Sequence, residues 1–159
     1  MPGTPRVEDL IVALQVPDAA AAVARIAQQL VPRQTSPADT IVAMAWATPD
    51  LVRTMERVAA PFVPADRDRL LGAITTYVNI GPVKLLLEQP EVEAGLAAYL
   101  SRYGEGLAAL YLDRPRFMPP SGPSGRPAKS LGTPLGRRGW LLPHDWPWGP
   151  FVIALDASR

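Results

Sequence analysis

Residues 39–59 read DTIVAMAWATPDLVRTMERVA, a short apolar run closed by Thr-Pro-Asp and followed by a polar, periodic segment. The run contains Ile, Val and Trp, which predicts a buried β-strand. Leu51, Met55 and Val58 share one helical face, so a helix is expected over 51–59, capped at its start. A strand that leads directly into a helix therefore begins this part of the chain.

The segments that follow predict a mostly β-structured domain. Residues 72–88, GAITTYVNIGPVKLLLE, are two β-rich runs around Gly81-Pro82 and predict a hairpin. A short amphipathic helix is expected over 91–103, stopped by Gly104. Further strands are expected at 62–63, 106–112, 139–142 and 151–156.

Two other regions of the chain differ from this pattern. Residues 6–31 are interpreted as two helices divided at Pro17-Asp18, although IVALQV at 11–16 can also be a strand. Residues 113–138 contain six of the 19 prolines and cannot hold an ordinary helix, so we expect a long extended loop, whether ordered or not. We therefore divide the chain into a helical extension, 1–38, and a domain, 39–159.

Composition excludes several kinds of chemistry. The 159 residues include no Cys and one His, which leaves no disulfide, zinc–thiolate site or two-imidazole metal site within one chain. A net charge of +1 gives no general attraction to nucleic acid. No apolar stretch is long enough to span a membrane, and the start lacks a secretory pattern, so we expect a cytoplasmic protein.

Two segments together resemble the vicinal oxygen chelate superfamily, which includes glyoxalases and methylmalonyl-CoA epimerase. The first is 39–51, which resembles the opening Asp-His-Ile strand of the family and its Pro-Asp-Leu helix start. The second is VKLLLEQP at 83–90 together with GEGLAAL at 104–110, after the helix. The resemblance implies an α+β fold of paired βαβββ modules whose curled sheets surround a cavity, here with a reduced second module.

The resemblance also implies a metal site, and the residues at its positions do not suit one. The histidines of the family fall at Thr40 and Ala109, its fourth-strand carboxylate or amide at Lys84 or Leu85, and its last-strand glutamate near Ala154. A methyl group cannot bind a metal ion, and an ammonium group repels one. We therefore expect neither a catalytic metal nor another cofactor.

Strand alternation then suggests which side chains face the cavity. If Thr40 points inward, Val42, Met44 and Trp46 follow it on the same face, and Tyr111 shares a face with Ala109 and Leu107. Counting from Ala154 places Val152 and Asp156 inward as well. The outcome is an apolar, aromatic pocket suited to a hydrophobic small molecule. Met44 and Trp46 can equally be core residues.

Three side chains are candidates for catalysis. His144 titrates near neutral pH, although a histidine in a turn often only caps a backbone carbonyl. Tyr111 can donate a hydrogen bond to a carbonyl group or simply pack in the core. Lys84 can favour an enolate or lie in solvent. Substrate-binding residues are expected among Thr40, Met44, Trp46, Trp140, Trp146 and Trp148.

These observations favour a metal-independent cyclase or isomerase that acts on a hydrophobic, polyketide-like molecule in bacterial natural-product biosynthesis. Such an enzyme works by shaping its substrate and by general acid–base catalysis. The alternative is a non-catalytic binder, such as a drug-sequestering resistance protein, and a third is a degenerate scaffold module. We expect a homodimer that binds neither nucleic acid nor membrane.

Overall fold

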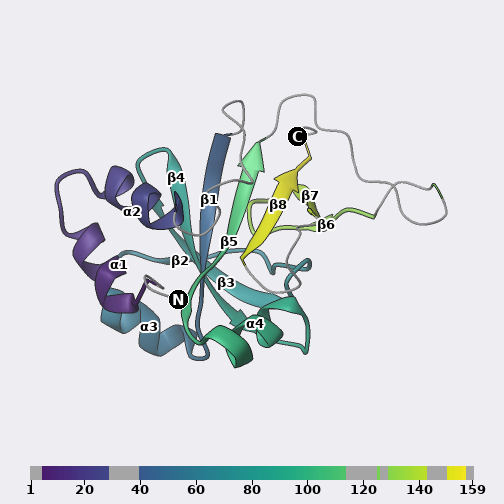
Figure 1. Ribbon diagram of the computed structural model, residues 1–159, viewed down its shortest axis with the longest axis horizontal. Coiled ribbons are helices and arrows are strands. Elements are labelled where there is room, and N and C mark those ends of the chain that lie inside the picture. Colours follow the sequence, from purple (N-terminus) through teal and green to yellow (C-terminus); the bar gives the residue numbers. More distant parts are fainter. Residues whose placement is uncertain (1–4, 29–39, 114–124, 126–128, 143–149, 157–159) are drawn as a thin grey trace.

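The computed structural model describes residues 5–28, 40–113, 125, 129–142 and 150–156, which form four helices and one eight-stranded sheet (Figure 1). The helices are α1 (Val7–Leu14), α2 (Ala19–Gln28), α3 (Leu51–Val58) and α4 (Gly95–Tyr103). The strands are β1 (Thr40–Ala47), β2 (Val63–Pro64), β3 (Ala73–Ile80), β4 (Val83–Pro90), β5 (Gly106–Asp113), β6 (Leu131–Gly132), β7 (Arg138–Leu141) and β8 (Phe151–Leu155).

The sheet is built from two halves with the same internal order. The order of its strands is β2-β3-β4-β1-β5-β8-β7-β6. In each half the first strand runs parallel to the last, β1 beside β4 and β5 beside β8, and the halves join where β1 meets β5 antiparallel. The second half is smaller, because β6 has two residues and β7 has four. The predicted pair of modules with a reduced second member is confirmed.

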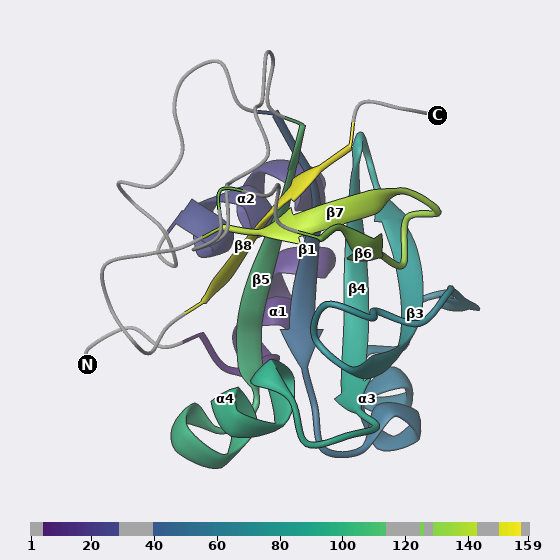
Figure 2. The same ribbon diagram turned by 90° about the vertical axis from the view of Figure 1, so that its right-hand side faces the viewer.

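The sheet curls so that its two ends approach each other (Figure 2). The loop that joins β2 to β3 belongs to one end, and β6 is the last strand at the other. The amide of Arg69 in this loop donates a hydrogen bond to the carbonyl oxygen of Gly132 in β6 at 3.0 Å. The curl gives the sheet an outer face and an inner face.

Helices α1, α2 and α3 cover the outer face (Figure 1). Leu10 of α1, Val23 of α2 and Trp46 of β1 are fully buried there. Asp18 caps α2, since its Oδ1 accepts a hydrogen bond from the amide of Ala21 at 3.1 Å. The two-helix interpretation of the N-terminal region is therefore confirmed, and the strand alternative is wrong. The helices share their core with the sheet.

Local sequence signals account for the other predicted elements. Asp50 caps α3 by accepting a hydrogen bond from the amide of Arg53 at 3.1 Å. The hairpin of β3 and β4 turns at Gly81, whose φ of +57° suits glycine. Helix α4 begins at Gly95, later than predicted, and β6 lies within the region expected to be a loop. Most of the Pro-rich segment lies outside the described residues.

The predicted face of β1 is wrong for Met44 and Trp46. The pairing of β1 with β5 shifts between Ile41 and Ala43, so Val42 is an extra residue in the ladder. Such a bulge reverses the alternation beyond it. Val42 therefore packs against the inner core, whereas Met44 and Trp46 belong to the outer core.

Similar departures affect β5 and β8. The β1–β5 pairing shifts again between Ala45 and Trp46, where Ala108 is the extra residue. Leu107 consequently packs in the outer core, while Ala109 and Tyr111 remain in the inner core as predicted. Val152 of β8 also lies in the outer core and not on the inner face. None of the helices in the described part of the chain is both long and apolar enough to cross a membrane.

Candidate functional site

Asp68 lies in the loop between β2 and β3, where backbone hydrogen bonds fix its position. Its Oδ1 accepts hydrogen bonds from the amides of Leu70 and Leu71, both at 3.0 Å. Its own amide donates to the carbonyl oxygen of Ala73 at 2.9 Å. Two amide donors at one oxygen suit an ionised carboxylate, which can only accept. The other oxygen, Oδ2, accepts a hydrogen bond from the hydroxyl of Tyr111.

Tyr111 joins this carboxyl group to a second one on the inner face. Its Oη lies 2.8 Å from Oε1 of Glu88, which belongs to β4. Opposite Tyr111 in the β1–β5 register lies Ala43, whose small side chain leaves room for the phenol ring. Asp68, Tyr111 and Glu88 are at most 1% exposed, and we refer to them as the inner cluster.

The hydrogen bonds of the inner cluster require two protons among three acidic groups. A phenol carries one proton, so Tyr111 can donate to only one of the two carboxyl groups. Two ionised carboxylates this close together in a buried site would repel each other strongly. This geometry therefore favours one protonated carboxyl group, and the amide donors at Asp68 point to Glu88 as that group.

The directions of the pKa shifts in the cluster agree with this assignment. Burial, followed by the neighbouring charge of Asp68, raises the pKa of Glu88 well above its usual range. Burial and the two carboxyl groups likewise raise the pKa of Tyr111 far above that of a free phenol. A neutral acid beside a carboxylate base is the arrangement that proton-transfer chemistry requires.

Some buried polar atoms beside the cluster have no partner among the described residues. Oε2 of Glu88 makes no hydrogen bond there, and neither does the hydroxyl of Thr75. Thr75 lies directly opposite Glu88 in the β3–β4 register. Most buried polar groups in native proteins are paired, so these two atoms are available to a bound molecule or to water.

The metal site that the fold family implies does not fit these residues. Ala109 and Ala154 are buried and carry no donor atom, and Thr40 is exposed at the start of β1. The Nζ of Lys84 lies 4.4 Å from the centroid of the Tyr77 ring. No three His, Cys, Asp or Glu side chains of the described ranges are grouped to hold a metal ion.

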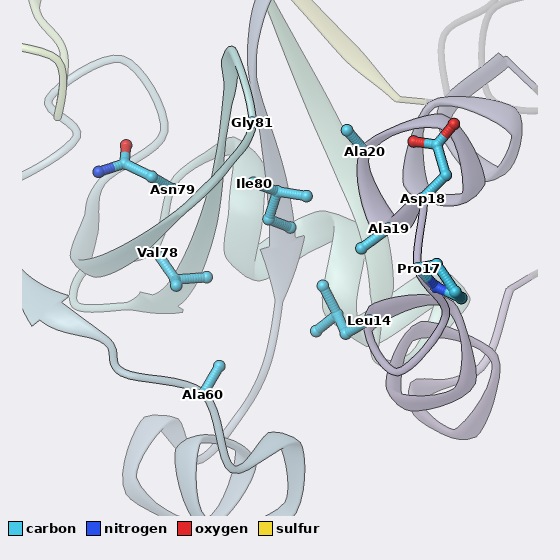
Figure 3. Close-up of a pocket in the computed structure, with 10 residues that line it drawn as sticks. All are labelled: Leu14, Pro17, Asp18, Ala19, Ala20, Ala60, Val78, Asn79, Ile80 and Gly81. Atoms are coloured by element: carbon cyan, nitrogen blue, oxygen red, sulfur yellow. The ribbon is translucent and has the colours of Figure 1, made fainter.

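A separate pocket of about 470 Å³ lies on the helix side, between the α1–α2 connection and the β3–β4 hairpin (Figure 3). Leu14, Val78 and Ile80 give it apolar walls. Among the described residues, Asp18 is the one charged side chain in its lining, and this carboxylate caps α2. The pocket can hold an apolar molecule, but it offers no acid–base pair.

The predicted site residues that the structure describes are not brought together in one place. Tyr111 lies in the inner cluster, whereas Lys84 is half-buried against Tyr77. Trp140 is half-buried in β7, where it pairs with Ala154. His144, Trp146 and Trp148 lie outside the described residues.

Sequence reasoning missed Asp68 and Glu88. A signal for Glu88 was present, because it is a carboxylate at the end of the apolar run VKLLLE and a buried strand rarely carries an unpaired charge. Asp68 in ADRDRLL carries the weaker signal of a turn-forming aspartate. Nothing in the sequence indicated that these side chains, 20 positions apart, meet at one tyrosine.

The strand order, the curl and the paired modules define the vicinal oxygen chelate fold, and comparison with solved structures agrees. The chain is similar to a hypothetical protein from Bacillus halodurans C-125, with a TM-score of 0.57 and 11% identity, covering 76% of this chain and 96% of that one. It is similar to the methylmalonyl-CoA epimerase of Mycobacterium tuberculosis, with a TM-score of 0.57 and 12% identity, covering 75% and 88%.

A third neighbour is the methylmalonyl-CoA epimerase of Streptomyces coelicolor, in a complex with 2-nitronate-propionyl-CoA. The TM-score is 0.52 and the identity 17%, covering 73% of this chain and 92% of that one. No family model and no curated protein matches the sequence. The structural similarity establishes a shared glyoxalase- and epimerase-like fold. Because the sequence identities are low, function must be argued from the site.

Proposed function

We propose that this chain is a metal-independent isomerase that moves a proton on a small organic molecule at the inner cluster. One observation carries the proposal: the hydroxyl of Tyr111 joins two buried carboxyl groups, and the pKa of one of them, Glu88, is raised well above its usual range. Pairs of acidic groups whose surroundings push their pKa values apart are typical of acid–base sites. The epimerase neighbours add support at the level of the fold alone.

The chemistry assigns a role to each member of the cluster. The carboxylate of Asp68 takes a proton from the carbon beside a carbonyl group, and the electrons of the broken C–H bond form an enolate. The Glu88 carboxylic acid then returns a proton to the enolate. Tyr111 then passes its proton to Glu88 and accepts one from Asp68, which restores the starting state. Positioned acids and bases of this kind contribute roughly 10²- to 10⁴-fold to a rate.

Access to the cluster sets a condition on the proposal. Leu70 and Leu71, in the same loop as Asp68, pack with the inner core. Asp68, Tyr111 and Glu88 are all buried, so a substrate reaches Glu88 only when neighbouring residues move. A cyclase acting on a polyketide-like molecule would need the same acid–base pair and, in addition, a cavity long enough to fold the chain.

Hydrogen exchange tests the isomerase directly. Wild-type protein in D₂O should introduce deuterium at the carbon beside the carbonyl group of small 2-methyl acyl thioesters, measured by NMR. Glu88→Gln and Asp68→Asn should slow this exchange about 100-fold or more, whereas Glu56→Gln, at an exposed site on α3, should not. Exchange that survives in Glu88→Gln, or no exchange by the wild type, would contradict the proposal.

The apolar pocket of Figure 3 favours a second candidate, non-catalytic binding of a hydrophobic molecule. Ala20 lies at its wall, so Ala20→Phe should fill the pocket and remove binding of a fluorescent apolar probe. Ala98→Phe, at an exposed position of α4, serves as the matched control. Probe binding that is unchanged by Ala20→Phe would eliminate this candidate.

A further inference from the structure

A second pocket, of about 420 Å³, lies where the two ends of the curled sheet approach each other. One wall is the loop between β2 and β3, and the other is the hairpin of β6 and β7. Its charged lining is mostly basic. The lining residues are Asp66, Arg67, Arg69, Gly132, Thr133, Gly136, Arg137 and Arg138.

Two of the four arginines are neutralised by carboxylates. Arg67 forms an ion pair with Glu91 at 2.9 Å. Arg137 forms an ion pair with Asp113 at 2.5 Å, and its Nε donates a hydrogen bond to the carbonyl oxygen of Asp156 at 2.9 Å. These contacts hold the walls of the pocket in place and leave little charge for a ligand.

The other two arginines, Arg69 and Arg138, have no carboxylate partner among the described residues. Arg138 donates hydrogen bonds to the hydroxyl and the carbonyl oxygen of Ser130, neither of which is charged. Arg69 makes no side-chain hydrogen bond or ion pair within the described ranges. Two guanidinium groups at one pocket thus have no ion-pair partner among the described residues, although the carboxylate of Asp66 also lines the pocket.

The backbone of Arg69 and the guanidinium group of Arg138 are held at the pocket before any ligand arrives. The amide of Arg69 donates to the carbonyl oxygen of Gly132 at 3.0 Å, which ties its loop to β6. A side chain at Gly132 would begin 3.8 Å from Cδ of Arg69, so the arginine stem runs beside this glycine. The Nε of Arg138 is fixed on Ser130 Oγ at 2.8 Å. Fixed donors lose less entropy when they bind.

We propose that this pocket binds the phosphate group of a small molecule, with Arg69 and Arg138 as its principal ligands. Guanidinium groups recognise phosphate through paired, charge-assisted hydrogen bonds, and two uncompensated cations match a dianion better than a monoanion. The chain as a whole has a net charge of +1, which gives no extended attraction for a polyanion. The inference is independent of the isomerase, because binding requires no turnover.

Calorimetric titration of the full chain at constant ionic strength tests the proposal. The probes are inorganic phosphate, phenyl phosphate, acetate and a single-stranded oligothymidylate. Saturable binding is expected for both phosphates and much weaker binding for acetate. A preference for phenyl phosphate would identify a phosphate ester as the ligand, and equal binding would identify free phosphate.

Variants locate the binding. Arg69→Gln and Arg138→Gln should each weaken phosphate binding at least tenfold, and both side chains are exposed, so the fold should survive. Arg53→Gln, at an exposed position of α3, should leave binding unchanged. Asp66→Asn removes the one carboxylate of the lining and should tighten binding severalfold.

Three results would overturn the proposal. The first is the absence of saturable phosphate binding by the wild type. The second is an equal loss in Arg53→Gln, which would mean general surface attraction. The third is tighter binding of oligothymidylate than of either phosphate, which would mean a polymer site. Thermal unfolding of each variant confirms that a loss of binding does not reflect a loss of folding.

Discussion

Two polar networks in the described part of the chain differ in character. The outer network comprises Trp46, Thr48, Thr54 and Glu105. The hydroxyl of Thr54 donates to Oε1 of Glu105 at 2.9 Å, the Trp46 indole donates to the same oxygen at 3.3 Å, and the Thr48 and Thr54 hydroxyls are 2.7 Å apart. Every side chain in this network has a partner.

The inner cluster is less complete. Glu88 is linked to Asp68 through the hydroxyl of Tyr111, has a raised pKa, and keeps one oxygen without a partner among the described residues. A network in which every polar group has a partner helps to specify a fold. A network with unpaired groups lowers stability, so its presence in the protein calls for a reason other than stability. The difference indicates that the outer network is structural and that the inner cluster is the place to look for function.

The outer network can be structural only if the N-terminal helices cover the outer face of the sheet. Deletion of residues 1–34 removes both helices and tests this condition. Leu10 of α1 and Val23 of α2 are fully buried, and four further apolar side chains of these helices are buried with them. Their combined burial is worth about 10 kcal/mol, which is comparable with the whole stability of a domain. The truncated chain should show no cooperative thermal unfolding, and a sharp transition would contradict this prediction.

Within the outer network, Thr54→Val should lower the free energy of unfolding by about 2 kcal/mol. The substitution leaves Thr48 and Glu105 with fewer hydrogen bonds while it keeps the shape of the side chain. Urea denaturation provides the measurement. A loss below about 0.5 kcal/mol would mean that this network does not contribute as a structural unit.

Thr75→Val is the matched substitution on the inner face and should act in the opposite direction. Its buried hydroxyl has no partner among the described residues, so replacing it with a methyl group should stabilise the fold by about 1 kcal/mol or leave it unchanged. The same denaturation experiment applies. Destabilisation equal to that of Thr54→Val would show that a hydrogen bond to this hydroxyl exists.

The smallest effect is expected outside both networks. Arg57 on α3 pairs with Glu8 on α1, and the side chains are 39% and 63% exposed. Solvent screens such a pair, so Arg57→Gln should change stability by less than about 0.5 kcal/mol. A larger loss in a thermal melt would mean that α1 is anchored by charge as well as by its apolar face.

Much of the fold could be predicted because its signals are local. The cap at Asp50 and the turn at Gly81 each depend on neighbouring residues, and the structure confirms both. The faces of β1 could not be predicted, because Val42 and Ala108 are extra residues that appear only when β1 and β5 pair. A shift of one residue exchanges the two faces of a strand.

The candidate site was harder to predict than the fold, because it is formed by contacts between distant parts of the chain. The sequence identified Tyr111 and its face, but not its partners, which lie 43 and 23 positions away. Asp68 contacts the tyrosine only because the sheet curls and brings the β2–β3 loop over the inner face. The clues in the sequence were a glutamate in an apolar strand and, more weakly, a turn-forming aspartate at position 68.

The central claim is that Glu88 holds a proton at neutral pH. In the unfolded chain a glutamate titrates near pH 4.3, and folding raises this pKa. Above about pH 4.3 the folded state therefore binds more protons than the unfolded state, so the free energy of unfolding falls as pH rises. Below that pH Glu88 is protonated in both the folded and the unfolded state, and its contribution to the free energy of unfolding is fully present.

The most direct test compares the urea stability of the wild type and Glu88→Gln from pH 4 to pH 8. Glutamine resembles the neutral acid but cannot titrate, and every other ionisable group is common to both proteins. The account predicts that the wild type loses stability relative to Glu88→Gln as pH rises through this range. Parallel curves, or a relative gain by the wild type, would show that Glu88 is ionised and would contradict the account.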